Sequence, residues 1–201
     1  GIDLPGEAAG IMPSAQWKRQ RLNTAWFDGD TINASIGQGF FLTTPLQLAV
    51  MTARIASRGD LVTPFVVDAS NGMQFDHPHQ QIEIAKPHWD YLHRAMQDVI
   101  EGQHGTARGI ATDGYTIAGK TGTAQVISIA ADEQYDRDEL DQRQRDHALF
   151  VAFAPVQQPR IAIALIVENG EHGSSVAAPI ARALLDHYMA LYPAPSTVAG
   201  G

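Results

Sequence analysis

The sequence predicts an α+β fold, in which an antiparallel sheet is flanked by helices. Three β-type runs follow one another in the second half of the chain, at 115–128, Ala148–Ala154 and Ile161–Glu168. Consecutive strands joined by short connections usually pair with their neighbours, so we expect an antiparallel meander. Segments with helical apolar spacing and capping signals lie on both sides of these runs. The length of 201 residues, 44% of them hydrophobic, corresponds to one domain.

The first forty residues are rich in turn-forming and aromatic residues, and no helix or strand begins clearly among them. Gly37-Gln38-Gly39 lacks the third glycine of a nucleotide-binding loop, so we interpret it as a turn near the floor of a site. The first clearly signalled helix comes next. Thr44 is its cap, Pro45 suits its first turn, Gln47 completes a capping box, and apolar residues continue to a stop at Gly59.

Two further elements are predicted before the meander. Leu61–Val67 has the composition of a strand, and Pro64 favours a position at the edge of a sheet. A second helix is expected to begin near Pro87 and to end at Gly102, because apolar residues recur there at helical spacing.

A last helix is expected to begin at Ser174 or Ser175 and to end at Tyr192. One of its faces carries small residues, which suits close packing against a sheet. We assign residues 1–192 to a single domain and expect residues 193–201 to form a disordered tail.

Acidic residues dominate the charge of the chain. The 22 Asp and Glu exceed the 14 Lys and Arg, and the net charge of −8 argues against a nucleic-acid partner. Seven of the acids lie between Asp132 and Asp146, which we expect to form a solvated insertion. The lack of cysteine excludes disulfides and thiolate metal sites. No leader sequence opens the chain, and its apolar runs are far shorter than the ~20 residues of a membrane-spanning helix.

Lys120-Thr121-Gly122-Thr123 is the most informative segment of the sequence. It places a cation, two hydroxyls and a glycine in the middle of a predicted strand. A glycine weakens a strand interior, and it is found there where a ligand or another backbone approaches closely. The alternative is an ordinary edge strand with a solvated lysine. The segment therefore marks the first place to look for a site.

The order of these parts resembles the penicillin-binding proteins and active-site-serine β-lactamases, whose third signature element is Lys-Thr-Gly. Further segments narrow the resemblance to penicillin-binding protein 2, the class B peptidoglycan D,D-transpeptidase of cell elongation. These segments are Gly1–Glu7, Gly29–Thr31, Ile36–Gly39, Thr44–Gln47, Gly105–Ala107, Lys120–Val126, Arg145–His147 and Val167–Gly170. The resemblance extends to about Tyr192 and implies the C-terminal portion of that transpeptidase fold.

The resemblance implies acyl transfer at a D-alanyl-D-alanine terminus through a covalent seryl intermediate, with β-lactams as inhibitors and no cofactor. It implies that Lys120, Thr121 and Thr123 gather around the carboxylate of the peptide or of a penicillin. The backbone N–H of Thr123 would supply half of an oxyanion hole, which makes Lys120 and Thr123 the implied catalytic residues. Gly122 would leave room for the acyl group, and Gln125 would point toward the bound peptide.

The sequence also departs from the family pattern. None of the three lysines, at positions 18, 86 and 120, has a serine three positions before it. None of the eight serines is followed two positions later by Asn or Asp. The Ser-x-x-Lys and Ser-x-Asn/Asp elements of the family precede its Lys-Thr-Gly element. We therefore expect the nucleophile in a preceding segment, and we expect the 201 residues alone to be inactive.

The resemblance further implies an enzyme at the periplasmic face of the inner membrane, anchored by an N-terminal segment. Its expected ligands are peptidoglycan stem peptides and β-lactams. Its expected macromolecular partners are the N-terminal part of the same protein and membrane proteins of the elongation machinery.

Three other interpretations stay open. The chain can be a non-catalytic substrate-binding scaffold of the cell-wall machinery. It can also be part of a serine β-lactamase, although the 81 residues that follow Lys120 form a longer C-terminal part than such an enzyme is expected to have. His77 and His79, with Asp76 beside them, have the appearance of a metal site. Their spacing matches no zinc pattern, so we favour an ordinary surface loop.

Overall fold

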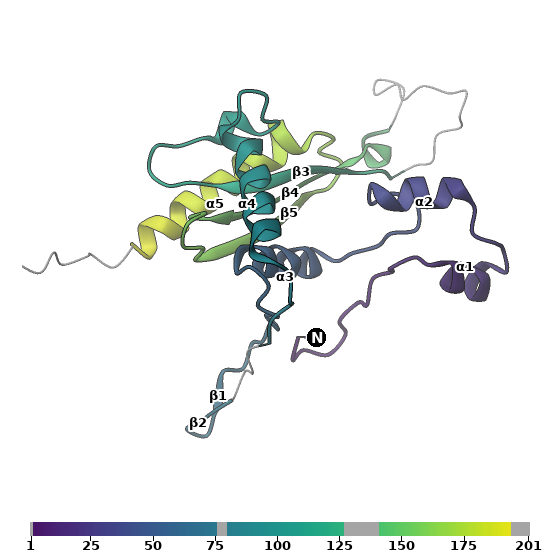
Figure 1. Ribbon diagram of the computed structural model, residues 1–201, viewed down its shortest axis with the longest axis horizontal. Helices are drawn as coiled ribbons and strands as arrows, with labels where there is room; N and C mark the ends of the chain where they lie inside the picture. Colours follow the sequence, from purple (N-terminus) through teal and green to yellow (C-terminus); the bar gives the residue numbers. More distant parts are fainter. Residues whose placement is uncertain (1, 76–79, 127–140, 194–201) are drawn as a thin grey trace, which may run out of the picture.

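A computed structural model describes residues 2–75, 80–126 and 141–193 of the chain (Figure 1). Its longer helices and strands are, in chain order, α1 (Ala15–Leu22), α2 (Asp28–Ser35), α3 (Pro45–Ala56), β1 (Ala69–Ser70), β2 (Met73–Gln74), α4 (Lys86–Glu101), β3 (Ala118–Ala124), β4 (His147–Ala154), β5 (Ile161–Val167) and α5 (Ala178–Leu191). Short helical turns occur at η1 (Arg108–Ile110), η3 (Gln142–Gln144) and η4 (Gly173–Ala177), the last of which is a π-turn leading into α5.

The main sheet has the strand order β3-β4-β5, and both pairs of neighbours are antiparallel. The predicted meander and the α+β class are therefore confirmed. Over the described residues the motif strand is shorter than predicted, because its ladder with β4 runs only from Ala118 to Ala124. Residues 127–128 of the predicted strand 115–128 lie outside the described residues. Beyond that point the N–H of Val126 donates to the Asp146 carboxylate at 3.3 Å instead of to a neighbouring strand.

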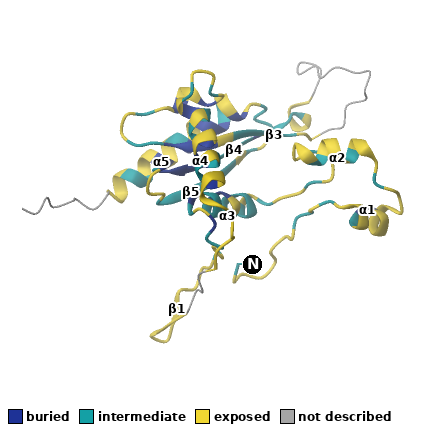
Figure 2. Cartoon of the chain, viewed as in Figure 1, coloured by how far each residue is buried: buried dark blue, intermediate teal, exposed yellow. Residues whose placement is uncertain are grey.

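Helices cover both faces of this sheet, and the central strand β4 contributes buried residues to each face (Figure 2). Side chains alternate along a strand, so Phe150 and Phe153 point in opposite directions. Phe150 belongs to a core shared with α5, whose buried face consists of small residues and Leu185. Phe153 belongs to a second core with Ala118 of β3 and Met96 of α4. On that second face α4 lies against β3 and α3 lies against β5.

The predicted capping of α3 is confirmed. The Thr44 hydroxyl accepts from the N–H of Gln47 at 3.1 Å, and the N–H of Thr44 donates to the Gln47 side chain at 2.9 Å. The predicted helix at 87–102 is α4, which buries Trp89, His93 and Met96 along one stripe. The 3.6-residue period of an α-helix places these positions on one face.

Two expectations about the N-terminal half were wrong. Leu61–Val67 is not a strand: the N–H groups of Val66 and Val67 donate to the Asp3 carboxylate, at 2.7 and 2.9 Å. A short two-stranded hairpin, β1–β2, follows this segment and projects from the body of the molecule (Figure 1). The first forty residues, where no helix was expected, contain α1 and α2.

A buried lysine joins α1 to α2. Lys18 is 6% exposed, and its ammonium donates to the Asp30 carboxylate at 2.6 Å. The same ammonium lies 4.8 Å from the ring centroid of Phe27 and 5.5 Å from that of Phe40. The hydrogen bond from Lys18 holds the pKa of the Asp30 carboxyl below its usual value. These contacts combine an ion pair with cation–π attraction and hold the two short helices together.

Several predicted features lie wholly or mainly outside the described residues. They are the acidic stretch up to residue 140, the tail after Pro193, and His77 and His79. In the described remainder of the acidic stretch, Arg145 and Asp146 are only partly exposed, and both contact the loop that follows β5.

Candidate active site

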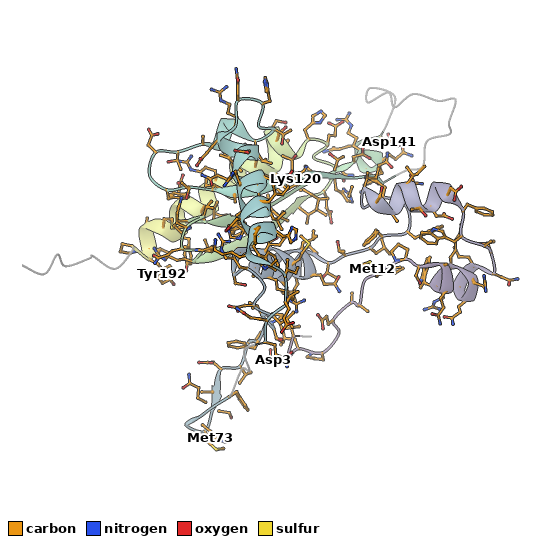
Figure 3. All side chains as sticks on the ribbon, in the orientation of Figure 1. Asp3, Met12, Met73, Lys120, Asp141 and Tyr192 are labelled. Atoms are coloured by element: carbon orange, nitrogen blue, oxygen red, sulfur yellow. The ribbon has the colours of Figure 1, made fainter. Side chains whose placement is uncertain are left out.

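The strand β3 presents the motif residues along an edge of the sheet. Lys120 is exposed and pairs in register with Val151 of β4, and its ammonium lies 2.8 Å from the carbonyl oxygen of Thr121. Thr121 and Thr123 are two residues apart, so their backbone groups point toward the same edge of the strand. The Thr121 carbonyl accepts the Lys120 ammonium, so these groups point away from β4. In the described part of the chain no strand pairs with this edge of β3, and an added ligand can pair there. Figure 3 marks Lys120 on the sheet.

The loop after α4 brings another hydroxyl to the motif. The Oγ1 atoms of Thr106 and Thr121 lie 3.2 Å apart, within hydrogen-bonding distance. Gly105 lets this loop pack closely on the end of α4, because a Cβ at that position would lie 2.4 Å from the carbonyl oxygen of Val99. Thr106 also lines a shallow hollow of about 460 Å³ formed with the C-terminal end of α4. A ligand on β3 therefore meets hydroxyls from two segments.

Thr123 is contacted by two segments that are distant in sequence. Its hydroxyl donates to the carbonyl oxygen of Glu171 at 3.4 Å. Its own carbonyl oxygen accepts from the side-chain amide of Gln38 at 3.2 Å. The turn predicted at Gly37–Gly39 therefore lies beside the motif strand, as expected. Gln125, in contrast, lies beyond the last paired residue of β3 and is exposed.

The loop between β5 and η4 is fixed by residues at the start of β4. The N–H of Asn169 donates to Nδ1 of His147 at 2.9 Å, and its side-chain amide donates to the carbonyl oxygen of Arg145 at 2.8 Å. The N–H of Glu171 donates to the carbonyl oxygen of Asp146 at 2.8 Å. Asn169 and Glu171 adopt positive φ angles of 57° and 61°. His147 is thus a structural hydrogen-bonding residue.

Gly173 brings the backbone of η4 directly onto the motif strand. A Cβ at this position would lie 2.5 Å from the carbonyl oxygen of Leu149, 2.8 Å from that of Gly122 and 3.1 Å from the Gly122 nitrogen. Real Cβ atoms do not approach backbone atoms this closely. A glycine inside a strand suggested that another backbone or a ligand approaches closely. Such an approach is present at Gly122, and the backbone of η4 makes it.

The chemistry available at this site is that of anion binding. Lys120 supplies an exposed cation, and Thr106, Thr121 and Thr123 supply hydroxyls. Across residues 2–75, 80–126 and 141–193, no group of three or more His, Cys, Asp or Glu is arranged to hold a metal ion. Thr106 and the Asn169–Gly173 loop were not identified as site residues from the sequence, although Thr106 and the first two residues of the loop lie in segments that carried the resemblance.

A sequence profile described as the penicillin binding protein transpeptidase domain matches residues 1–186. The chain belongs to this family. Among curated members, it is 47% identical over 195 residues to the peptidoglycan D,D-transpeptidase MrdA of Acinetobacter baumannii and 37% identical over 196 residues to MrdA of Escherichia coli. Each alignment covers 94% of this chain.

Solved structures of penicillin-binding proteins have the same fold. PBP2 of Pseudomonas aeruginosa, solved in complex with WCK 5153, has a TM-score of 0.80 and 42% identity, and the match covers 93% of this chain and 40% of that one. PBP2 of Helicobacter pylori, solved in complex with MreC, has a TM-score of 0.78 and 35% identity over 96% of this chain and 33% of that one. The resemblance to penicillin-binding proteins of the PBP2 type is therefore confirmed.

The chain corresponds to only part of these relatives. It spans 29% of the A. baumannii transpeptidase and 31% of the E. coli protein. Within the described part of the chain, no helix has both the length and the apolar character that crossing a membrane requires.

Proposed function

We propose that this chain is the substrate-binding portion of a peptidoglycan D,D-transpeptidase, which cross-links stem peptides and is acylated by β-lactams. The single observation that carries the proposal is the Lys120-Thr-Gly-Thr123 segment on the open edge of β3, within a domain of the penicillin-binding transpeptidase family. An extended peptide can add to such an edge through main-chain hydrogen bonds. Its terminal carboxylate then meets Lys120 and the hydroxyls beside it.

The proposed reaction is an acyl transfer in two steps. A serine hydroxyl attacks the carbonyl carbon of the penultimate D-alanine, the C–N bond breaks, and the terminal D-alanine leaves with the proton. An amine of a second stem peptide then attacks the ester and releases the serine. In this proposal Thr123 contributes its N–H to the oxyanion, and Lys120, Thr121 and Thr123 bind the carboxylate. Gly122 leaves space for the acyl group, and Gln125 contacts the peptide beyond it.

The nucleophilic serine is proposed to come from a segment outside these 201 residues, because Ser-x-x-Lys does not occur among them. That segment would also anchor the protein at the periplasmic face of the inner membrane. Partners from the elongation machinery are part of the same proposal. Its support is that one relative, PBP2 of H. pylori, was solved as a complex with MreC.

Replacing Lys120 by alanine in the full-length protein tests this function. The exposed lysine packs little, and a hydrogen bond to a charged group contributes about 1.5–3 kcal/mol. We therefore expect acylation by a fluorescent penicillin to slow by about 10- to 100-fold, with little change in melting temperature. Lys86→Ala is the matched control, since its side chain is 79% exposed and its ion pair is with Asp90 on the same helix. Equal acylation rates in wild type and Lys120→Ala would refute the assigned role.

A second measurement separates this proposal from a non-catalytic scaffold and from a β-lactamase. The 201-residue chain alone is expected to form no covalent penicillin adduct, and the full-length protein is expected to form a stable one. A scaffold would leave even the full-length protein unlabelled. A β-lactamase would release the adduct rapidly and destroy penicillin with multiple turnovers.

A further inference from the structure

The turn at Gly37–Gly39 carries one side chain to the motif strand. Nε2 of Gln38 donates to the carbonyl oxygen of Thr123 at 3.2 Å, between residues 85 positions apart in sequence. Gln38 is partly buried there. Gln38 lies in the Ile36–Gly39 segment that carries the family resemblance, but none of the three signature elements, Ser-x-x-Lys, Ser-x-Asn/Asp and Lys-Thr-Gly, includes it or accounts for it.

The backbone around Gln38 is shaped to aim this side chain. The two flanking glycines have positive φ angles, 74° at Gly37 and 75° at Gly39. Such angles are unfavourable for residues with a Cβ. A Cβ on Gly39 would also lie 3.3 Å from Cβ of Asn33, and the N–H of Gln38 donates to the carbonyl oxygen of Asn33 at 2.9 Å. The turn is therefore folded back onto the end of α2.

The base of this turn is held rigidly as well. α2 is fixed to α1 through the buried ion pair of Lys18 with Asp30, and Trp17 packs against Phe40 with ring centroids 5.4 Å apart. Phe40 directly follows the turn. Gln38 thus extends from a small packed unit and reaches β3 from outside the sheet.

Three contacts from two segments, the Asn169–Gly173 loop and the Gly37–Gly39 turn, define the position of Thr123. Gly173 packs against the backbone of Gly122, which forms the peptide plane that carries the Thr123 N–H. Glu171 accepts the Thr123 hydroxyl at 3.4 Å, and Gln38 holds the following peptide plane through its carbonyl oxygen. Fixing both peptide planes of a residue fixes its φ and ψ angles, and therefore the direction of its N–H.

We infer that Gln38 is a positioning residue for Thr123, which orients the Thr123 N–H for the developing oxyanion during acylation. This inference rests on the proposed function, since it needs that N–H to act in the transition state. A misdirected oxyanion donor weakens transition-state stabilisation more than ground-state binding. The effect of Gln38 should therefore appear in the rate constant of acylation at saturation, and not in the apparent dissociation constant of the preceding complex.

The test is penicillin acylation of the full-length protein, with both constants measured by stopped flow. A neutral hydrogen bond is worth about 0.5–1.5 kcal/mol, so we expect Gln38→Ala to lower the saturating rate constant about 2- to 10-fold. The apparent dissociation constant should stay within about twofold. Gln38→Glu keeps the size of the side chain but places an acceptor against the Thr123 carbonyl, and it should lower the rate constant at least as much. Gln20→Ala, at an exposed position of α1, is the matched control and should match wild type.

The outcomes separate this inference from the proposed function. A wild-type protein that forms no adduct overturns the proposed function itself. A wild type that is acylated, together with Gln38 variants of unchanged saturating rate constant, overturns the positioning role alone, whatever their melting temperatures. A change confined to the dissociation constant overturns it too, because it assigns Gln38 to ground-state binding. A faster rate in Gln38→Ala also overturns it, since Gln38 would then compete with the ligand for the Thr123 carbonyl.

Discussion

Replacing Gly173 by alanine is predicted to damage the motif strand without touching any of its side chains. The added methyl would lie 2.5 Å from the carbonyl oxygen of Leu149 and 2.8 Å from that of Gly122. Both oxygens belong to paired strands, so neither can retreat without distorting the ladder between β3 and β4. Overpacking of this kind destabilises a protein by about 1–3 kcal/mol.

Gly109 provides the matched control. A Cβ at Gly109 would meet no atom within 4 Å, so alanine is sterically accepted there. At an accepted position, Gly→Ala stabilises by about 0.4–1 kcal/mol, because the unfolded chain loses freedom. The two variants should therefore differ by about 1.4–4 kcal/mol in free energy of unfolding.

Thermal unfolding of the full-length protein and its penicillin acylation rate measure the effect. Gly173→Ala should melt below wild type, and Gly109→Ala at or slightly above it. The acylation rate of Gly173→Ala should also fall, because Gly122 must shift. If Gly173→Ala melts together with Gly109→Ala and is acylated at the wild-type rate, the proposed close packing of η4 on β3 is wrong.

Two further predictions concern a buried histidine and a residue with a positive φ angle. His93 is 3% exposed, its Nε2 lies 2.7 Å from the carbonyl oxygen of Ile55, and its Nδ1 has no hydrogen-bond partner among the described residues. Burial lowers the pKa of His93 from 6.5 and Arg58 lowers it further, while the hydrogen bond to Ile55 and the charge of Asp90 oppose this shift. The net direction is downward, so the unfolded chain takes up the proton first. The free energy of unfolding should then fall as the pH drops below about 6.5, by up to ~1.4 kcal/mol per pH unit. Urea titrations between about pH 5 and 7 should show a smaller pH dependence for His93→Gln. An unchanged dependence in that variant would exclude His93 as its source. Asn169 has a φ of 57°, which an alanine adopts less readily than a glycine. Asn169→Ala should therefore be less stable to urea than Asn169→Gly, by about 1 kcal/mol in free energy of unfolding. Equal urea midpoints for the two variants would show that backbone strain is unimportant at this position.

Local signals explain which parts of the fold were predictable. The capping box at Thr44, the apolar stripe of α4 and the closely spaced β4 and β5 are all encoded within a few neighbouring residues. α1 was not predictable in this way, because its residues are mostly polar and its anchor, Lys18, depends on Asp30 twelve positions later. The strand expected at Leu61–Val67 failed for a similar reason, because the N–H groups of Val66 and Val67 are satisfied by Asp3 from a distant segment.

The candidate site shows the same division. The motif at Lys120–Thr123 was predicted on a strand from its residue types alone, and it lies on one. Its surroundings could not be predicted, because the contacts of Thr106, Gln38 and Glu171 with this strand form only when loops distant in sequence fold together. The positive φ of Glu171 leaves no mark in its residue type, whereas the glycines beside Gln38 did indicate a turn.

The single-sided pairing of β3 has a consequence for amide hydrogen exchange. Along this strand the N–H groups alternate between the β4 ladder and the open edge. The amides of Lys120 and Gly122 should exchange slowly, at a rate limited by opening of the sheet. The amides of Thr121 and Thr123, in the same strand, should exchange quickly. An extended peptide bound at the edge would slow the fast pair and leave the slow pair unchanged. Residue-resolved exchange would therefore report occupancy of the edge directly, without any chemical step.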